Sequence, residues 1–317
     1  MRPARLERAT FCFVGKRSIR LSYGRILTDG FSLLTSKPDY RRRFQTVSTK
    51  WAKSEGQRAK SEGQRAKAGS AKLRVRSPDG RQLSMKQRVL NDSSHIPESI
   101  PYIIQNLRAV YGKPRPECGL DPLDVLIETI LSQSTSNINS RRAFENLKKR
   151  FPTWEQARRA RVTSIEAAIR SGGLARQKSV RIKNLLNEIY QQRGSLDLSF
   201  LRSAPLDEAR QFLASFKGIG PKTVACTLLF ACNRPVFPID THIFRIARRL
   251  ALIPERCSDE QAHEIMERIL PAARYFEVHI NLIRHGRRVC RPSDPLCEEC
   301  CLVEYCRYYD ARSLRAV

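Results

Sequence analysis

Residues 216–223 read FKGIGPKT, and this stretch predicts two helices joined by a tight turn. Apolar helical stretches flank it at residues 209–216 and 224–232. Gly218 and Gly220 permit a positive φ and the close approach of another backbone. Pro221 suits the first turn of a helix, where its missing N–H costs nothing. The stretch therefore predicts a helix–hairpin–helix whose exposed amides can hold a phosphate group.

A second informative stretch, PIDTHIFR, lies downstream at residues 238–245. Pro238 is expected to end one element, and Asp240 and Thr241 are both good N-cap residues for the next. The sequence therefore predicts that Asp240 lies at the start of a helix, a short distance along the chain from Lys222 of the hairpin.

Four cysteines near the end of the sequence have the spacing C-x6-C-x2-C-x5-C: Cys290, Cys297, Cys300 and Cys306. All-cysteine ligation suits iron–sulfur clusters or zinc. The spacing differs from that of a zinc ribbon, in which two CxxC knuckles are separated by a longer loop. Structural or disulfide-bonded cysteines are the alternative, which the intracellular character of the chain disfavours. Cys301 does not fit the spacing and is expected to be a bystander.

The composition indicates a polyanionic partner. The formal net charge is +27, and residues 85–317 alone carry 37 Lys and Arg against 25 Asp and Glu. A basic surface can serve solubility alone, but a bias of this size favours nucleic acid.

Residues 1–84 are predicted to be a disordered basic extension. The heptapeptide AKSEGQR at residues 52–58 repeats unchanged at 59–65, and such a polar repeat cannot build a core. Residues 4–25 resemble a peptide produced when a reading frame overruns a tRNA gene, so the extension is expected to lie outside the true gene product, which would start at Met85. An organelle transit peptide and a basic DNA-binding arm are the alternatives.

From Met85 onward the pattern predicts an all-α fold. Apolar residues recur at helical spacing, and no segment shows the alternation of a strand. Expected helices cover residues 97–111, 122–133, 141–151, 164–169, 178–190, 259–269 and 272–284. No apolar run reaches the length of a membrane span and no signal peptide is evident. We therefore expect a soluble intracellular protein with no membrane partner, in the cytoplasm or nucleoid, or in an organelle or the nucleus if the extension is a targeting segment.

Together the three motifs resemble the endonuclease III superfamily of DNA glycosylases, over roughly residues 100–309. GIGPKT resembles the family's hairpin with its catalytic lysine, which implies that role for Lys222. PIDTHIFR resembles the segment with the catalytic aspartate, which implies Asp240. The four cysteines match the spacing of the family's [4Fe–4S] ligands, and HGR at residues 285–287 is also similar. The segment GSLDL at 194–198 is similar to small plant and bacterial members, which resemble the catalytic core of plant 5-methylcytosine glycosylases.

The resemblance implies a fold of two lobes. A six-helix barrel lobe with the hairpin would span residues 122–236, and an iron–sulfur cluster lobe would combine residues 85–121 with 237–317. DNA would bind between them, with Lys222 and Asp240 facing each other across the cleft.

The implied activity is that of a bifunctional DNA glycosylase and AP lyase in base excision repair, acting as a monomer. Its partner would be double-stranded DNA with a damaged or mismatched base or an abasic site. An oxidised pyrimidine is the default substrate, while 5-methylcytosine, mismatched thymine and mismatched adenine stay open. A non-catalytic DNA-binding protein that kept the hairpin and the cluster is the alternative from another class.

Further DNA contacts follow from the resemblance. Gln133 and Leu174 would fill the hole left by an extruded base, and the other predicted contacts are Gly218, Gly220, Thr223, Arg287 and Arg291. Glu128 has the spacing to Gln133 that the catalytic glutamate has in adenine-mismatch glycosylases. A glutamate that only caps or pairs within the fold is the expected reading, because those enzymes typically lack the hairpin lysine.

Overall fold

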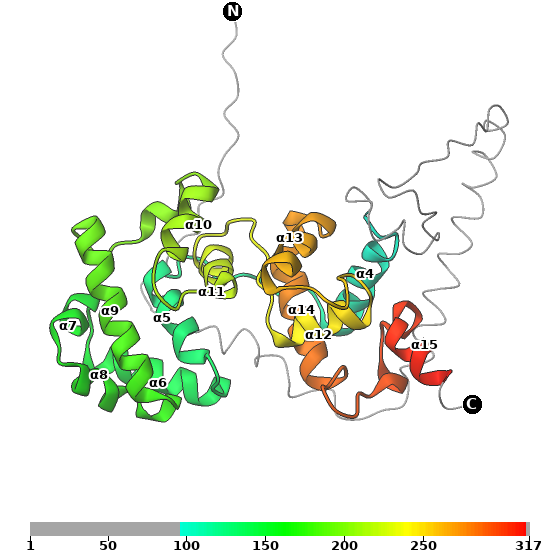
Figure 1. Ribbon diagram of the computed structural model, residues 1–317, viewed down its shortest axis with the longest axis horizontal. Helices are drawn as coiled ribbons and strands as arrows, with labels where there is room; N and C mark the ends of the chain where they lie inside the picture. Colours follow the sequence, from blue (N-terminus) through cyan, green and yellow to red (C-terminus); the bar gives the residue numbers. More distant parts are fainter. Residues whose placement is uncertain (1–95, 315–317) are drawn as a thin grey trace, which may run out of the picture. The chain divides into compact units, whose positions relative to one another are not determined.

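The structure is a computed structural model that describes residues 96–314, and the predictions for residues 1–84 lie outside this part. The described residues form helices and contain no strand, which confirms the all-α class. The helices are α4 (Ser99–Tyr111), α5 (Pro122–Ser132), α6 (Asn137–Arg150), α7 (Trp154–Arg159), α8 (Val162–Ala168), α9 (Ala175–Arg193), α10 (Leu206–Ala214), α11 (Pro221–Cys226), α12 (Thr241–Arg249), α13 (Asp259–Ile269), α14 (Tyr275–Arg288) and α15 (Arg307–Ser313) (Figure 1). Six short turns link them: η1 (Arg170–Gly172), η2 (Ser199–Arg202), η3 (Thr227–Ala231), η4 (Ala272–Arg274), η5 (Cys297–Glu299) and η6 (Val303–Tyr305).

Side-chain caps explain where several helices begin. Asp121 accepts hydrogen bonds from the backbone N–H groups of Leu123 and Asp124, and Pro122 occupies the first helical position of α5. Capping boxes open α7 at Thr153 and α13 at Ser258. These bonds satisfy N–H groups that have no partner within the helix itself.

The helices form two groups by their contacts. In the first, α5 contacts α6, α9 and α11, and α9 contacts α7 and α8. In the second, α14 contacts α4 and α12, and α12 contacts α15 (Figure 1). Helix α13 contacts α11 of the first group, and η3, which contacts α5 and α11, also contacts α14 and so joins the two groups. We propose that they correspond to the two predicted lobes.

Helix α5 is the centre of the first group. Its apolar side chains are buried on every side, and five of them are 0% exposed: Leu123, Leu126, Ile127, Ile130 and Leu131. A helix that is apolar all round belongs inside a core rather than on its surface. Its C-terminal end, just before Gln133, is therefore held firmly.

Several predicted helix bounds were wrong, and three differences from the prediction are informative. Helix α6 begins at Asn137 rather than near residue 141, because the Ser136 hydroxyl accepts from the backbone N–H of Asn139 and caps it. Helix α7 was not predicted at all. The apolar stretch 224–232 is α-helical only to Cys226 and continues as the π-helical turn η3, an irregularity that often marks functional sites.

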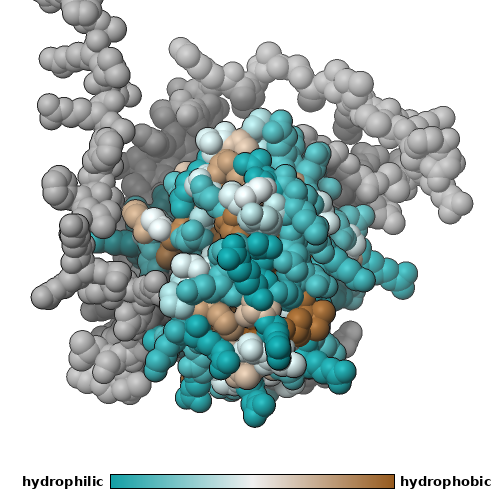
Figure 2. Space-filling model, turned by 90° about the vertical axis from the view of Figure 1, so that its left-hand side faces the viewer, coloured by the Kyte–Doolittle hydropathy of each residue, from teal (hydrophilic) through white to brown (hydrophobic). Residues whose placement is uncertain are grey.

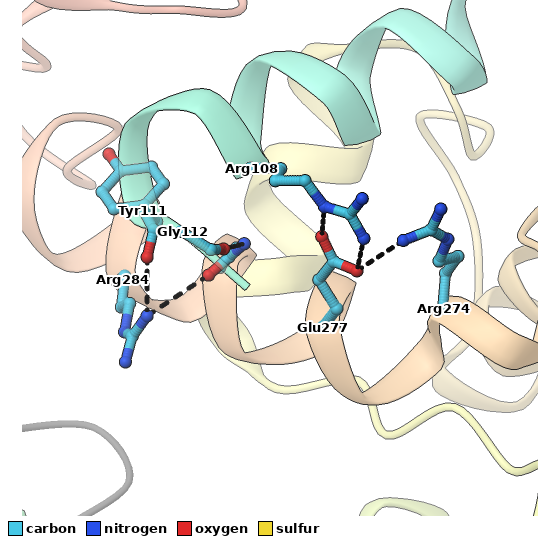
Figure 3. Close-up of polar contacts among 7 residues, drawn as sticks. Arg108, Tyr111, Gly112, Arg274, Glu277 and Arg284 are labelled. Atoms are coloured by element: carbon cyan, nitrogen blue, oxygen red, sulfur yellow. Dashed lines mark hydrogen bonds and ion pairs between the residues drawn. The ribbon is translucent and has the colours of Figure 1, made fainter. Parts of the chain in front are cut away.

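A buried carboxylate joins α4 to α14. Glu277 is 5% exposed, and its two oxygens accept from Nε and Nη2 of Arg108 in a fork while Arg274 donates at 3.0 Å (Figure 3). Further along the same two helices, Arg284 of α14 donates to the carbonyl of Tyr111, the last residue of α4. Such bidentate pairs are among the stronger charge-assisted contacts.

The surface of the first group is mainly hydrophilic. Figure 2 shows the side of the molecule on which α7 and α9 lie, with apolar residues in small separate groups. None of the described helices combines the length and apolar character that a membrane span needs.

We expect Glu277→Gln to lower the free energy of unfolding by about 2 kcal/mol. Removing one partner of a fully buried ion pair costs about 3–5 kcal/mol, and the loss here is smaller because the arginine side chains are 36% and 38% exposed. Glu145→Gln is the matched control, since Glu145 is 61% exposed and, within the described part of the chain, pairs only with Arg141, and it should cost less than about 0.5 kcal/mol. Urea denaturation measures both, and equal losses would contradict this account.

Candidate active site

The hairpin between α10 and α11 has the predicted tight turn. Gly218 has φ +84°, and a Cβ at this position would lie 2.7 Å from Nε of Arg181, so only glycine fits. Pro221 is the first residue of α11, as expected. The prediction for Gly220 was wrong in part, because its φ is −91°. A Cβ there would meet no atom within 4 Å, so the space in front of Gly220 is open.

Lys222 is half-buried in the first turn of α11 and lines a cavity of about 200 Å³. The other lining residues come from α5, the hairpin, the segment before α12, and α13: Thr129, Gln133, Gly220, Pro221, Thr223, Ile239, Asp259 and His263. A lysine thus lies at the wall of a partly open cavity, beside the hairpin.

Asp240 caps α12, as the sequence predicted. Its Oδ1 accepts from the backbone N–H groups of His242 at 2.9 Å and Ile243 at 2.8 Å. No described residue donates a hydrogen bond to Oδ2. The cap therefore fixes the carboxylate while one oxygen keeps its lone pairs.

His279 of α14 interacts electrostatically with both Lys222 and Asp240. It is 0% exposed, and its Nδ1 donates to the carbonyl of Pro238 at 2.9 Å. Burial lowers the pKa of His279 to about 4, Asp240 raises this pKa, and Lys222 lowers it. The amine and the carboxylate therefore lie within electrostatic range of one neutral imidazole.

The segment before Asp240 is held by side chains rather than by regular structure. Glu267 accepts from the backbone N–H of Phe237 at 2.9 Å. His263 donates through Nδ1 to the carbonyl of Phe237 at 2.9 Å. Burial lowers the pKa of His263, so its Nε2 carries a lone pair at neutral pH.

Gln133 also lines the cavity, and its side chain is held at both ends. Its Oε1 accepts from Nη1 of Arg181 at 2.6 Å, and its Nε2 donates to the Thr223 hydroxyl at 3.4 Å. Thr223 is only 3% exposed. A DNA contact at Thr223 stays a prediction.

Leu174 lies on the surface in a strained conformation. It is 53% exposed, has φ +49° and precedes the first residue of α9. The left-handed region costs a non-glycine residue on the order of 1 kcal/mol. Strain of this kind persists only where the surrounding structure enforces it.

The four predicted ligand cysteines lie close together. The pKa of the Cys300 thiol is raised to about 12, chiefly by burial and in smaller part by the neighbouring Cys290, Cys306 and Cys297. Burial raises the pKa of the Cys301 thiol, and among the other described thiols only Cys300 contributes to this rise. Within residues 96–314, no three His, Cys, Asp or Glu side chains are arranged around one metal ion.

Arginines of α12 hold the loop that follows α14. Arg249 donates to Sγ of Cys290 at 3.1 Å and to the carbonyl of Arg291 at 2.7 Å, and Arg245 donates to the carbonyl of Cys290. Gly286 lets α14 approach α12 closely, because a Cβ there would lie 2.8 Å from Cβ of His242.

The two predicted phosphate-binding arginines are exposed. Arg287 donates to Oδ1 of Asn137 at 3.2 Å, which links the end of α14 to the start of α6, close in sequence to Gln133. Arg291 donates to the carbonyl of Arg288. Their DNA contacts stay predictions.

Glu128 is 8% exposed within α5. Its neighbour Thr129 lines the cavity, whereas Glu128 does not. Of the predicted catalytic residues, Lys222 lines the cavity, whereas Asp240, like Glu128, does not, although its neighbour Ile239 does.

Comparison with known proteins identifies the family to which this fold belongs. Residues 127–272 match the HhH-GPD superfamily of base excision DNA repair proteins. Endonuclease III of Thermotoga maritima is 30% identical over 199 residues, which cover 63% of this chain and 89% of that enzyme.

The chain belongs to the endonuclease III-like HhH-GPD superfamily.

Two further similarities bear on this endonuclease III-like protein. An Arabidopsis thaliana protein, named only provisionally as a DNA glycosylase, is 42% identical over 165 residues. That match covers 52% of this chain and 56% of the Arabidopsis protein. A solved structure of endonuclease III trapped covalently on DNA superposes with a TM-score of 0.59 at 24% identity, covering 68% of this chain and 98% of that one. It shares the fold.

The cysteines of this endonuclease III-like chain fit an iron–sulfur cluster. Each thiolate of a tetranuclear cluster binds a different iron, so the sulfurs need not surround one point. The Arg249 guanidinium and the backbone N–H of Leu302 already donate to sulfurs of Cys290 and Cys300. Burial raises the pKa values of the Cys297, Cys300 and Cys306 thiols, so bound cations would be needed to hold them as thiolates.

Sequence reasoning missed four residues that organise the site: Lys178, Arg181, His263 and His279. Each acts through contacts with residues far away in the sequence. A lone histidine or a basic residue on a helix gives no local signal of such a role.

We expect Cys300→Ser to lose iron and thermal stability, because ligand loss is loss of folding free energy in a segment organised by metal. Cys301→Ser is the matched control on the adjacent residue and should keep both. Iron and sulfide content and the melting temperature measure the difference, and equal behaviour of the two variants would show that the ligand set is wrong.

Proposed function

We propose that this endonuclease III-like protein is a bifunctional DNA glycosylase and AP lyase. The observation that carries the proposal is Lys222 on the wall of a cavity that Ile239 also lines, next to the Asp240 carboxylate that caps α12. A positioned amine and a nearby proton acceptor are what covalent catalysis at a sugar carbon requires.

Several features support duplex DNA as the substrate. The open space at Gly220 admits a phosphate backbone. Leu174 presents an exposed apolar side chain that can enter an unstacked base step. The net charge of +27 favours a polyanion. Because a base inside duplex DNA is inaccessible, the nucleotide must be extruded before the reaction.

The chemistry begins at C1′ of the extruded nucleotide. Nζ of Lys222 attacks C1′, the glycosidic C1′–N bond breaks, and the base departs with the bonding electron pair. Asp240 accepts the proton that Nζ loses and can pass it to the departing base. The carboxylate also stabilises positive charge that develops on the sugar.

The C1′–O4′ bond then breaks as the lone pair of Nζ forms an imine with C1′, and the ring oxygen takes up a proton. Strand cleavage follows from this imine. Removal of a C2′ proton expels the 3′ phosphate with the electrons of the C3′–O bond. Water then hydrolyses the imine and frees Lys222. The same lysine thus serves glycosylase and lyase steps.

The iron–sulfur cluster would be held by Cys290, Cys297, Cys300 and Cys306. When bound, it supplies a rigid scaffold and redox-active iron, and no hydrolytic step needs it. The loop that it organises carries Arg291 and follows Arg287, and both are available to phosphates.

An oxidised pyrimidine is the proposed substrate base. A panel of duplexes with an oxidised pyrimidine, a mismatched thymine, a mismatched adenine or 5-methylcytosine tests this choice. Excision of the oxidised pyrimidine should exceed that of the other bases, and preference for another member of the panel would replace this assignment.

Lys222→Gln should abolish strand cleavage and borohydride trapping on an abasic duplex while DNA binding survives, because no other lysine among residues 96–314 lines the cavity. Lys217→Gln is the matched control, since Lys217 is an exposed lysine of the same hairpin, and it should keep both activities. If Lys222→Gln keeps lyase activity, another amine forms the imine. If it keeps excision of a mismatched adenine, Glu128 becomes the candidate catalytic acid.

Asp240→Asn should reduce turnover on the order of a hundredfold. Asparagine caps helices about as well as aspartate, so α12 should stay intact and the melting temperature should hardly change. Single-turnover cleavage of an oxidised-pyrimidine duplex measures the effect. Turnover close to wild type would remove Asp240 from the mechanism.

A further inference from the structure

Helix α9 carries a buried lysine that takes no part in the proposed chemistry. Lys178 is 3% exposed, and its Nζ donates to the carbonyl of Leu131 at 2.7 Å, the Thr135 hydroxyl at 2.7 Å and the carbonyl of Gly172 at 2.9 Å. These bonds use all three donors of an ammonium group. No carboxylate pairs with Lys178 among the described residues, so burying this charge is costly.

Each of the three acceptors lies close in sequence to Gln133 or to Leu174. Leu131 and Thr135 each lie two residues from Gln133, and Gly172 lies two residues before Leu174. The Thr135 hydroxyl also bonds the carbonyl of Gly172. Nζ of Lys178 is therefore the point at which the two segments predicted to enter DNA are tied together.

Both segments have conformations that need support. Ser134 has φ +52° and Leu174 has φ +49°, and such residues persist only where their surroundings fix them. A cation suits this position because Leu131 lies in the last turn of α5, where carbonyl groups lack helical partners and the helix dipole is negative.

A second residue of α9 acts differently on the same segment. Arg181 holds the side chain of Gln133 through Nη1, and this bond must break before Gln133 can enter DNA. The bonds of Lys178 go to groups on either side of Gln133 and can persist while the side chain moves.

We propose that Lys178 is a positioning residue that fixes Gln133 relative to Leu174, so that both enter the duplex where a nucleotide is extruded. This inference rests on the proposed glycosylase function. Lys178 does not line the cavity, so it acts on extrusion of the nucleotide and leaves the reaction at Lys222 unchanged.

Lys178→Met is compared with Lys183→Met, a control on the same helix. Nζ of Lys183 likewise donates to backbone carbonyl groups, those of Arg158 and Ala160 at the end of α7, which carry no predicted DNA contact. The readouts are single-turnover excision from an oxidised-pyrimidine duplex, fluorescence of 2-aminopurine beside the lesion, and borohydride trapping on a single-stranded abasic oligonucleotide, which requires no extrusion.

Lys178→Met should reduce duplex excision and the 2-aminopurine signal tenfold or more relative to Lys183→Met, with single-strand trapping unchanged in both. Equal duplex excision by the two variants would overturn the inference, as would an equal loss of single-strand trapping and duplex excision in Lys178→Met. If wild type itself neither excises nor traps, the proposed function fails instead.

Thr135→Val provides a second variant in case Lys178→Met does not fold. It keeps the shape of the side chain and removes the hydroxyl that bonds Lys178 and Gly172. The ratio of duplex excision to single-strand trapping should fall severalfold, and an unchanged ratio would contradict the positioning role.

Discussion

The structure depends on how residues 236–240 are held, because this segment leads into Asp240 without regular secondary structure. Buried backbone groups need hydrogen-bond partners, and here side chains from two helices supply them. Glu267 of α13 accepts from the backbone N–H of Phe237, and His263 of α13 donates to its carbonyl. His279 of α14 donates to the carbonyl of Pro238. Asp240 is thereby fixed before any substrate arrives.

The same contacts relate the two groups of helices. His279 packs edge-on against Phe230 of η3 at 5.3 Å between ring centroids and against Phe237 at 6.1 Å, so α14 meets the helix that continues from the hairpin. Helix α12 connects the cysteine region to these helices, because its Arg245 and Arg249 donate hydrogen bonds to Cys290. Lys222, Asp240 and the cysteines are thus parts of one connected framework.

Local signals predicted much of this arrangement. Pro221, Gly218 and Asp240 were placed correctly because each has a backbone preference that needs no tertiary partner. The prediction for Gly220 was wrong in part. Gly220 does not adopt a positive φ, and its lack of a side chain instead leaves open space in front of the hairpin. The π-helical turn η3 and the roles of Lys178 and His279 could not be predicted, because they arise from packing between segments distant in the sequence.

The central claim is that Lys222 forms the covalent link to DNA. The most direct test is borohydride reduction of the wild-type protein on an abasic duplex, followed by proteolysis and mass spectrometry of the peptide that carries the sugar. The account predicts the adduct on the peptide that contains Lys222. An adduct on Lys178, on another lysine or on the N-terminal amine would contradict it.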